Sequence, residues 1–435
     1  MDMNKKLFLY KDYFATTFFS LLIIFSRPLV GIYIFGFRIG ELLVGLAFIL
    51  YFYFLYKYKS FPPNYIYLFY SIFLISISFV ISSFLNNEFI FSTYIFQTSS
   101  YIWTISFIFI GYSYKADNKN IAYYFSASLI ILYIVNTIYY PGLFINFFTS
   151  YSDKFELAKA SSILISIVFV NILNFYLIEN KKFVNYFFIF STSLFLPLLL
   201  FNSRGSFLSL VFFILMTSFY KRNMFLVSLK RTFAFIAIFS MVFIASTYNI
   251  FGELDFSKRS ESQNIEISSV SSNLNKLIEN KNTVDVFLSF YIYEGRIYSR
   301  DGTTDWRLDI WQDIIEDLND KDQIYSGYGY SSILPIMVDP EAPGRLGEDG
   351  LNENVHNYIF TILARGGLIQ LILFLYFHYK IFIIYRQKNK NSFVLVLIIP
   401  SMFNAFLDVA MESVQFPLMY YVLLGFMIST KRQFV

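Results

Sequence analysis

Four groups of polar residues have side chains that can bind an anion or move a proton. The first is the stretch Asn202-Ser203-Arg204-Gly205-Ser206, which opens a long apolar run. An arginine at such a boundary is costly to bury and usually has a partner or a function, and its planar guanidinium suits bidentate phosphate binding. Gly205 would let a phosphate approach the backbone, and a helix starting near Ser206 adds a positive end. The alternative is an arginine that only anchors a helix end.

The second and third groups are a lone arginine and a lone histidine. Arg307 lies in a segment with helical spacing, where it can pair with Asp309 or Asp313, the ordinary role of a surface charge. His356, followed by Asn357, stands just before an apolar run. Its imidazole can accept a proton from a hydroxyl near neutral pH or donate a hydrogen bond to a phosphate. The alternative is a histidine that caps a helix.

The fourth group is a pair of carboxylates, Asp408 and Glu412, between the last two apolar runs. Ionisable groups at membrane depth are functional candidates by default. Spaced four apart, the two would share a face if one helix continued through both. They can orient an arginine or accept a hydrogen bond from a hydroxyl. The alternative is a pair of exposed loop charges.

Several classes of site are excluded by composition. The chain has no Cys and two His, which excludes thiolate catalysis, Cys-ligated zinc, disulfides and a His-rich metal centre. Asp320-Lys321-Asp322 has the form of a metal-binding Asp-x-Asp but lies in a run typical of a solvated turn. No Gly-Lys-Ser phosphate-binding loop is present, so ATP hydrolysis is not the energy source. We expect no metal, no cofactor and no nucleic-acid partner.

The elements that position these groups are membrane helices. Apolar residues make up 56% of the chain and charged residues 15%, against roughly 45–50% and 25% in soluble domains. A span needs roughly 20 apolar residues. The pattern predicts an all-α polytopic membrane protein of about twelve spans. They begin near Tyr13, Ile39, Asn64, Ser92, Ile121, Ala158, Phe183, Gly205, Arg231, Val355, Phe393 and Glu412.

The basic residues of the connections support this topology. Lysine and arginine recur in the even-numbered turns and at both termini, whereas the odd-numbered short turns hold few of them. By the positive-inside rule, both termini are cytoplasmic and the four polar groups lie on the outer face. The basic residues assigned to the cytoplasmic side are Lys5, Lys6, Lys11, Lys57, Lys59, Lys115, Lys119, Lys181, Lys182, Lys221, Arg222, Lys230, Arg231, Arg386, Lys388, Lys390, Lys431 and Arg432.

The chain divides into three parts: residues 1–250, an N-terminal bundle of about nine spans; 251–354, a large outer loop; and 355–435, about three further spans. The loop holds nine Lys and Arg against twenty Asp and Glu. Its stretch from Lys258 to Asn282 is polar and expected to be partly mobile. An amphipathic helix is predicted near residues 304–319, capped by Thr303 or Thr304. It either lies on the lipid surface or packs on its own loop.

The order of these features resembles the O-antigen polymerase and ligase superfamily. The matching segments are Ser203-Arg204-Gly205 opening a membrane helix, Arg307 shortly before Ile310-Trp311, the turn Ser326-Gly327-Tyr328-Gly329, His356-Asn357-Tyr358 followed by Ile359, Leu363, Gly366, Gly367 and Leu368, and Asp408 with Met411-Glu412 and Gln415-Phe416. The resemblance covers mainly residues 200 to 430. One departure is Arg365, which stands where relatives often have an acidic residue before the glycines.

The resemblance implies a membrane glycosyltransferase of GT-C-like architecture in the bacterial inner membrane, with its active site on the periplasmic face. The donor would be a glycan on undecaprenyl diphosphate, and no metal is expected. By position, Arg204 and Arg307 would bind the diphosphate. His356 would lie beside the reacting centre as base, with Glu412 as second choice. Gly205, Asn357, Asp408 and Arg365 are supporting candidates.

Two acceptors and one further class remain open. A polymerase joins the glycan to another lipid-linked repeat unit, and the Tyr/Phe-rich character and the stretch from Glu412 to Phe416 look more like polymerases. A ligase moves the glycan onto lipid A-core. A lipid-linked oligosaccharide flippase also fits twelve helices, but transporters bind substrate near the membrane midplane. Membrane lipid, a chain-length regulator and a flippase of the same pathway are the implied partners.

Overall fold

A computed structural model shows the fold and describes residues 3–57, 65–88, 92–114, 120–225, 228–252, 289–340, 342, 344–347, 350 and 352–430. The polar stretch 258–282 predicted to be mobile lies outside the described residues. So do Lys59, Lys115, Lys119, Lys431 and Arg432, and the side chains of Lys5, Lys6 and Lys11.

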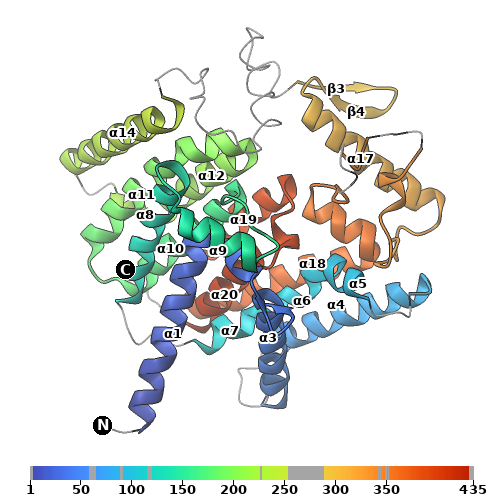
Figure 1. The fold of residues 1–435 in the computed structure, drawn as a ribbon, viewed down its shortest axis with the longest axis horizontal. Coiled ribbons are helices and arrows are strands. Elements are labelled where there is room, and N and C mark those ends of the chain that lie inside the picture. The colour runs from blue at the N-terminus through green and yellow to red at the C-terminus, as the bar shows by residue number, and fades with distance from the viewer. Residues whose placement is uncertain are drawn as a thin grey trace.

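The described chain is almost entirely helical (Figure 1). Its first half contains α1 (Met3–Phe25), α2 (Arg27–Val30), β1 (Tyr33–Ile34), β2 (Phe37–Arg38), α3 (Ile39–Tyr56), α4 (Ile66–Leu85), α5 (Thr93–Thr98), α6 (Ser100–Trp103), η3 (Thr104–Phe107), α7 (Ile108–Ser113), α8 (Ile121–Thr137), α9 (Gly142–Tyr151), α10 (Ala160–Leu177) and α11 (Lys181–Asn202).

The second half contains α12 (Arg204–Tyr220), α13 (Arg222–Phe225), α14 (Leu229–Phe251), β3 (Phe290–Tyr293), β4 (Arg296–Ser299), α17 (Gly302–Asp320), η4 (Pro335–Met337), α18 (Tyr358–Asn389), α19 (Leu395–Leu407), η5 (Ala410–Glu412) and α20 (Gln415–Ser429). The strands form two small antiparallel hairpins, β1–β2 and β3–β4. The predicted helical fold is therefore confirmed, with two short hairpins that the sequence did not predict.

Six described helices are long and apolar enough to cross a membrane: α3, α4, α10, α11, α14 and α18. A seventh is obtained if α8 and α9, which meet at an angle of 92°, count as one span. Helices also stand at the other predicted positions, but their apolar parts are shorter: Tyr13–Phe25, Arg204–Tyr220, Leu395–Leu407 and Gln415–Ser429. The fourth candidate is broken into α5, α6, η3 and α7. Twelve spans therefore remain a prediction.

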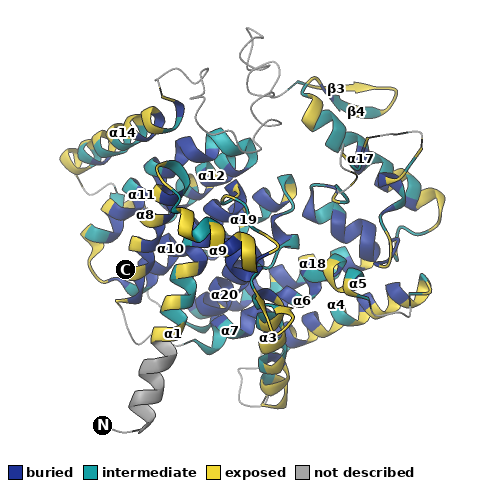
Figure 2. Cartoon of the chain, in the orientation of Figure 1, coloured by how far each residue is buried: buried dark blue, intermediate teal, exposed yellow. Residues whose placement is uncertain are grey.

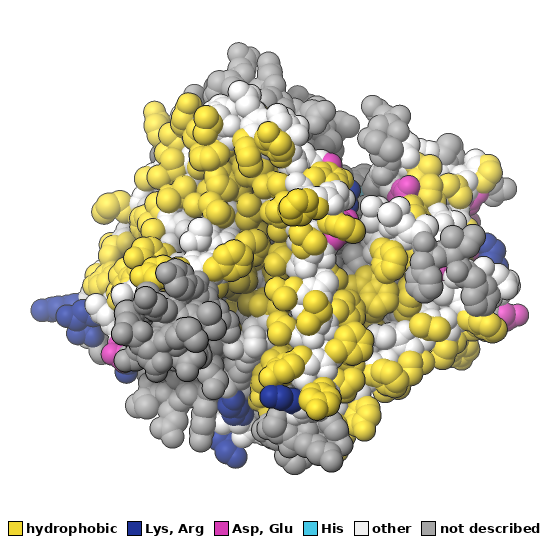
Figure 3. Space-filling view, turned by 60° about the horizontal axis from the view of Figure 1, so that its bottom comes forward, with side chains coloured by type: hydrophobic (Ala, Val, Ile, Leu, Met, Phe, Trp, Pro, Cys, Tyr) yellow, Lys and Arg dark blue, Asp and Glu magenta, His cyan; other side chains and the backbone are white. Residues whose placement is uncertain are grey.

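The helices differ in how much of their apolar surface other helices cover. The most apolar stretch of α10 is 94% buried, whereas the corresponding stretches of α3 and α14 are only 22% and 17% buried. Figure 2 shows the covered helices in dark blue near the centre and exposed positions along α3 and α14. A helix that is apolar all round is either buried or faces lipid, so α10 belongs to the core and α3 and α14 to the lipid boundary. Figure 3 shows one face covered largely by apolar side chains.

Polar side chains and glycines hold the core helices together. Asn171 Nδ2 of α10 donates to Ser191 Oγ of α11 at 3.1 Å, and Asn174 Nδ2 donates to Ser126 Oγ of α8 at 2.9 Å. A Cβ at Gly425 in α20 would lie 2.0 Å from the Ile108 carbonyl oxygen in α7. Interhelical hydrogen bonds and small residues of this kind are what membrane helices use in place of a hydrophobic driving force.

The loop between α14 and α18 contains the predicted amphipathic helix, which extends over Gly302–Asp320 as α17. Asp301 caps it, accepting from the Thr304 backbone N at 3.2 Å, so the expected cap at Thr303 or Thr304 was wrong by two or three residues. Of the two arrangements considered, the helix packs on its own loop. The buried face of α17 consists of Ile310, Trp311, Ile314 and Leu318. It packs against apolar side chains of the loop that follows the helix: Tyr328, Leu334, Ile336 and Met337.

The loop returns to the membrane helices at a break in α18. Gly367 has φ 72° and interrupts the helical backbone. The turn that follows α17 fills the break: Tyr328 N donates to the Ala364 carbonyl at 2.7 Å, and Leu368 N donates to the Ile324 carbonyl at 2.8 Å. Gly327 of the turn and Gly367 of α18 are therefore needed, because the backbone of each segment lies where a Cβ on the other would be.

We expect Gly367→Ala to destabilise the protein by about 2–5 kcal/mol. The new Cβ would lie 2.2 Å from the Tyr325 carbonyl oxygen, on a backbone with positive φ. The measurement is thermal unfolding of the purified protein in detergent. Gly45→Ala in α3 is the matched control, because a Cβ there meets nothing within 4 Å. Equal melting temperatures for the two variants would contradict the packing described.

Candidate functional site

The first turn of α12 brings Arg204 to the end of α19. Ser203 caps the helix by accepting from Ser206 N at 3.4 Å. A Cβ on Gly205 would lie 3.0 Å from Leu407 Cβ, and Asn404 Nδ2 donates to Ser206 Oγ at 2.8 Å. Gly205 therefore allows α12 and α19 to pack closely, and its Cα faces Leu407, so the expected role of admitting a phosphate is not what the packing indicates.

The outer loop supplies the partner of this arginine. Arg204 Nη1 lies 3.7 Å from Asp301 Oδ1, and both side chains are largely covered. Asp301 is also the residue that caps α17. One carboxylate therefore ties the loop helix to the start of a membrane helix.

Arg307 points from α17 towards the same place. Its Nη1 donates to the Leu407 carbonyl at 2.9 Å, and its buried Nε has no hydrogen-bond partner among the described residues. Burial lowers the pKa of Arg307 from its ordinary value, and the charges of Asp408 and Asp301 oppose that shift. The charge of Asp301 thus acts on both Arg204, with which it pairs, and Arg307, which partly offsets the cost of covering the two cations.

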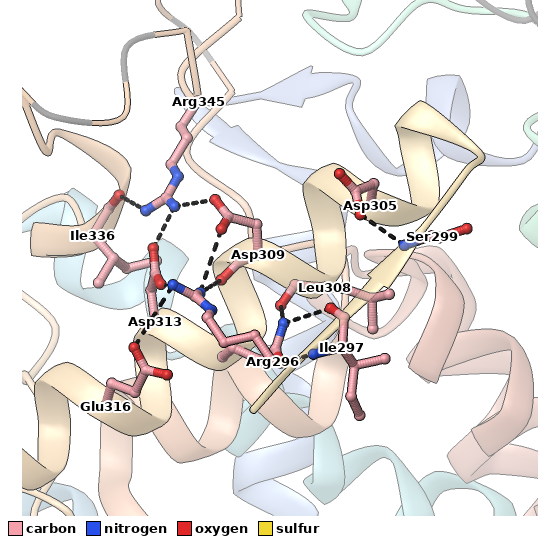
Figure 4. Close-up of polar contacts among 11 residues, drawn as sticks. Arg296, Ile297, Ser299, Asp305, Leu308, Asp309, Asp313, Glu316, Ile336 and Arg345 are labelled. Carbon is pink, nitrogen blue, oxygen red and sulfur yellow. Dashed lines mark hydrogen bonds and ion pairs between the residues drawn. The ribbon is translucent and has the colours of Figure 1, made fainter. Parts of the chain in front are cut away.

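The expected pairing of Arg307 with Asp309 or Asp313 was wrong. Those two carboxylates bind Arg296 and Arg345 instead, as Figure 4 shows. Arg345 is only 4% exposed and also donates to the Ile336 carbonyl at 2.9 Å. Residues two positions apart on a helix lie on nearly opposite faces. We call the pairing of Arg296 and Arg345 with Asp309 and Asp313 the clamp. Because the clamp fixes the face of α17 that carries Asp309, Arg307 points towards the membrane helices.

His356 lies against α17 in a strained backbone conformation. Its φ is 52°, a region that non-glycine residues rarely occupy and that clusters at functional sites. Nε2 lies 3.1 Å from Asn352 Oδ1, and the ring packs edge-on to Trp306 with centroids 5.5 Å apart. Trp311 Nε1 donates to the carbonyl of Val355 at 2.8 Å. Helix α17 thus fixes both the peptide bond between Val355 and His356 and the imidazole ring of His356.

The surroundings keep this imidazole neutral. Burial lowers the pKa of His356 to about 4, and the charges of Arg307 and Lys159 lower it too, while Asp408 opposes them. A neutral imidazole has one nitrogen free to accept a proton. His356 is therefore unprotonated and able to accept a proton over the physiological pH range, although a pKa this low also makes it a weaker base than an ordinary histidine.

Asn357 has a structural function. Its Oδ1 accepts from the backbone N of Ile359 at 3.0 Å and of Phe360 at 3.3 Å, which caps α18. The side chain is fully buried, and its Nδ2 has no partner among the described residues. The capping role considered for His356 thus belongs to its neighbour.

The two carboxylates do not share a helical face. α19 ends at Leu407, Asp408 accepts from Val409 N at 2.8 Å, and Glu412 stands in the turn η5. Glu412 Oε1 accepts from Thr361 Oγ1 at 2.6 Å. Burial raises the pKa of Glu412 to about 7, against the effects of Thr361 and Arg365. Glu412 therefore lies by Thr361 and Arg365, whereas Asp408 lies near Arg307 and His356.

Arg365 joins the Glu412 part of the site. It is 4% exposed and donates to the carbonyls of Ser332 at 2.6 Å and Gly329 at 3.3 Å. Its charge favours the ionised form of Glu412. Arg365 thus holds the returning loop while its charge faces a buried carboxyl.

A cavity of about 1420 Å³ adjoins these groups. Asp408, Glu412, Arg365 and Thr361 line it, whereas Arg204, Arg307 and His356 are not among its lining residues. Asp408 therefore connects two parts: the arginine–histidine cluster on one side and the cavity on the other. The predicted residues come from four separate segments and meet in this region.

The sequence did not identify three residues of the site: Asp301, Trp306 and Lys159. Asp301 is an acidic residue before a helical pattern, which is a recognisable cap, but nothing in the sequence indicates its contact with Arg204. Trp306 belongs to the apolar face of the helix predicted near residues 304–319, which does not indicate its contact with His356. Lys159 is one of the few basic residues of the odd-numbered turns, and nothing in the sequence indicates that it lies near His356. Among the described residues no group of His, Asp and Glu could hold a metal ion; a metal-free site remains a prediction.

The comparisons concern the middle of the chain. Residues 187–375 match the family model described as O-Antigen ligase. The matched segment contains Arg204, Arg307, His356 and Arg365 and stops before Asp408. No curated protein matches the chain. The predicted resemblance to the O-antigen polymerase and ligase superfamily is confirmed by this match.

We expect Asp313→Asn to loosen α17, because Arg345 is left with one carboxylate in a buried setting. Amide exchange of α17 should accelerate by about tenfold or more in hydrogen–deuterium exchange mass spectrometry. Asp320→Asn, at the solvent-exposed end of the same helix, is the control and should leave exchange unchanged. Equal exchange in both variants would show that the clamp does not hold the helix.

Proposed function

From the membership of residues 187–375 in the O-antigen polymerase and ligase superfamily, we propose that this protein is a surface-polysaccharide polymerase. Members of the family are glycosyltransferase-like enzymes. The proposed reaction transfers a glycan from undecaprenyl diphosphate onto a sugar hydroxyl of another lipid-linked repeat unit. It takes place at the periplasmic face of the bacterial inner membrane.

One observation carries the proposal: two half-buried guanidinium groups and a neutral imidazole come together from three separate elements. Arg204 reaches Asp301 from α12, Arg307 reaches the end of α19 from α17, and His356 lies against α17. A diphosphate develops negative charge as the anomeric bond breaks. Arginines placed there stabilise the transition state more than the ground state.

The chemistry balances without a metal or a cofactor. The acceptor hydroxyl oxygen attacks the anomeric carbon, and the bond from that carbon to the phosphate oxygen breaks. The diphosphate leaves with the electron pair, and the hydroxyl proton passes to a base. Direct displacement inverts the anomeric centre. His356 is the first candidate for the base, because it is neutral and lies beside the arginines, and Glu412 is the second.

The remaining features of the proposal follow from the topology predicted from the sequence. They are about twelve spans in a GT-C-like arrangement, both termini in the cytoplasm, and a donor and acceptor held at the outer side. A chain-length regulator and a flippase of the same pathway are the proposed partners. Among the described residues, the charged groups lie mostly at helix ends and in the loop rather than deep in several spans, which favours an enzyme over a transporter.

A ligase is the second candidate, because the matching family model carries that description. The two enzymes share the donor and the leaving group and differ in the acceptor, lipid A-core for the ligase. The same cluster would serve both reactions. The lipopolysaccharide ladder distinguishes them, because loss of a polymerase leaves one repeat on the core, whereas loss of a ligase leaves none and lipid-linked polymer accumulates.

We expect Arg204→Ala, Arg307→Ala and His356→Ala each to lower transfer by about 10²-fold or more, because each removes a charge or base at the reacting centre. The readout is the lipopolysaccharide ladder, with protein levels in the membrane measured alongside. Arg300→Ala, an exposed arginine of the same loop, is the control. Arg307→Lys keeps the charge and the helix but loses the planar fork, so it should also fail. An unchanged ladder in all three alanine variants would reject the site.

The pH dependence of kcat/KM separates the two candidate bases. Since kcat/KM reports the free enzyme and the pKa of His356 is about 4, transfer through His356 should be flat between about pH 5.5 and 8.5. The assay is glycan transfer in reconstituted membranes. A rate that rises through pH 7 and loses this dependence in Glu412→Gln would instead identify Glu412, whose pKa is about 7.

A further inference from the structure

The amino end of α10 opens into the cavity beside the arginine–histidine cluster. The first intrahelical hydrogen bond runs from Ile163 N to the Lys159 carbonyl at 3.0 Å. The backbone N–H groups of Ala160, Ser161 and Ser162 therefore have no acceptor within the helix, and none among the other described residues. The first turn contains no acidic residue. This end of the helix keeps its partial positive charge.

Two serine hydroxyls at the same end also lack partners. Ser161 and Ser162 are 4% and 2% exposed, line the cavity, and have no side-chain hydrogen bond among the described residues. Ser166, one turn further on, instead donates to the Ser162 carbonyl at 2.8 Å, as serines within a helix often do. Buried hydroxyls are normally satisfied, so an unpartnered pair facing a cavity points to a ligand that bonds them.

A cation completes this end of the helix. Lys159, the residue before the first helical position, lines the cavity, and its Nζ lies 3.4 Å from Glu156 Oε2. Glu156 is shared, because its other oxygen pairs with Arg27 Nη1 at 2.5 Å. Two cations therefore face one carboxylate, which leaves positive charge at this wall. Four carboxylates also line the cavity, those of Glu41, Glu353, Asp408 and Glu412. An anion is therefore expected to bind at the Lys159 wall rather than beside them.

We infer that the amino end of α10 binds a phosphate group of the lipid-linked substrate. The three backbone N–H groups, the hydroxyls of Ser161 and Ser162 and the ammonium of Lys159 supply the hydrogen-bond donors. A tetrahedral phosphate, with several terminal oxygens, can accept from all of them, whereas a carboxylate has only two oxygens. The inference rests on the proposed function, since that function supplies the diphosphate.

This site is separate from the two arginines of the proposed reacting centre. Arg204 and Arg307 do not line the cavity, whereas Lys159, Ser161 and Ser162 do. Lys159 is nevertheless close enough to His356 to act on its charge. The phosphate at α10 belongs either to the donor, whose diphosphate would extend past the histidine, or to the acceptor, which in a polymerase carries a diphosphate of its own.

The test is direct binding of glycan-free undecaprenyl diphosphate to the purified full-length protein in lipid nanodiscs, with undecaprenol as the uncharged control. The key pair of variants is Ser161→Asp and Ser161→Asn, which have nearly the same shape and differ in charge. A carboxylate at this helix position favours the fold but repels a phosphate. We expect Ser161→Asp to weaken binding of the diphosphate by about tenfold or more and Ser161→Asn by much less. Lys159→Gln should weaken binding, and Lys159→Arg should restore it.

Stoichiometry identifies the source of the phosphate. One bound diphosphate, weakened both by Ser161→Asp and by Arg204→Ala, assigns the site to the donor. Two bound diphosphates, of which each variant removes one, assign it to the acceptor. Unchanged affinity and stoichiometry in both Ser161→Asp and Lys159→Gln would overturn the inference. Because this assay involves no sugar transfer, it can fail while the ladder experiment supports the proposed reaction, or succeed while that experiment fails.

Discussion

The position of the loop helix α17 against the start of α12 depends on the carboxylate of Asp301. One of its oxygens starts α17 by accepting from Thr304, and the other lies by Arg204 at the start of α12. Its charge also acts on Arg307. Covering a cation costs free energy that a nearby counter-charge offsets in part, and both arginines are half-buried. The carboxylate of Asp301 therefore fixes the loop relative to the start of α12 while its charge, with that of Asp408, favours the charged form of Arg307.

Much of the site could be predicted because its residues are rare and stand next to long apolar runs. Arg204, Arg307 and His356 were identified from type and order, and the structure brings them to one region. The helical spacing of the apolar residues in the loop predicted α17 to within about two residues. These features depend on short-range patterns, which a single sequence displays.

Other features depend on contacts between distant segments, and the sequence could not show them. Arg307 turns away from Asp309 because Arg296 and Arg345 already occupy that face of the helix. The positive φ of His356 is maintained by the packing of Trp306 and the bond to Asn352, not by its own preference. Helix length was also misleading, since hydropathy predicts an apolar stretch but not where a break such as the one before Glu412 shortens it.

The break in α18 has a consequence for how the protein is made. The loop emerges from the ribosome before α18, yet its returning turn is completed by backbone bonds to Ala364 and Leu368 of that helix. Those acceptor and donor groups become available only after the later segment has been synthesised and inserted. The loop must therefore stay incomplete until that segment has been made, and its maturation is coupled to synthesis of α18.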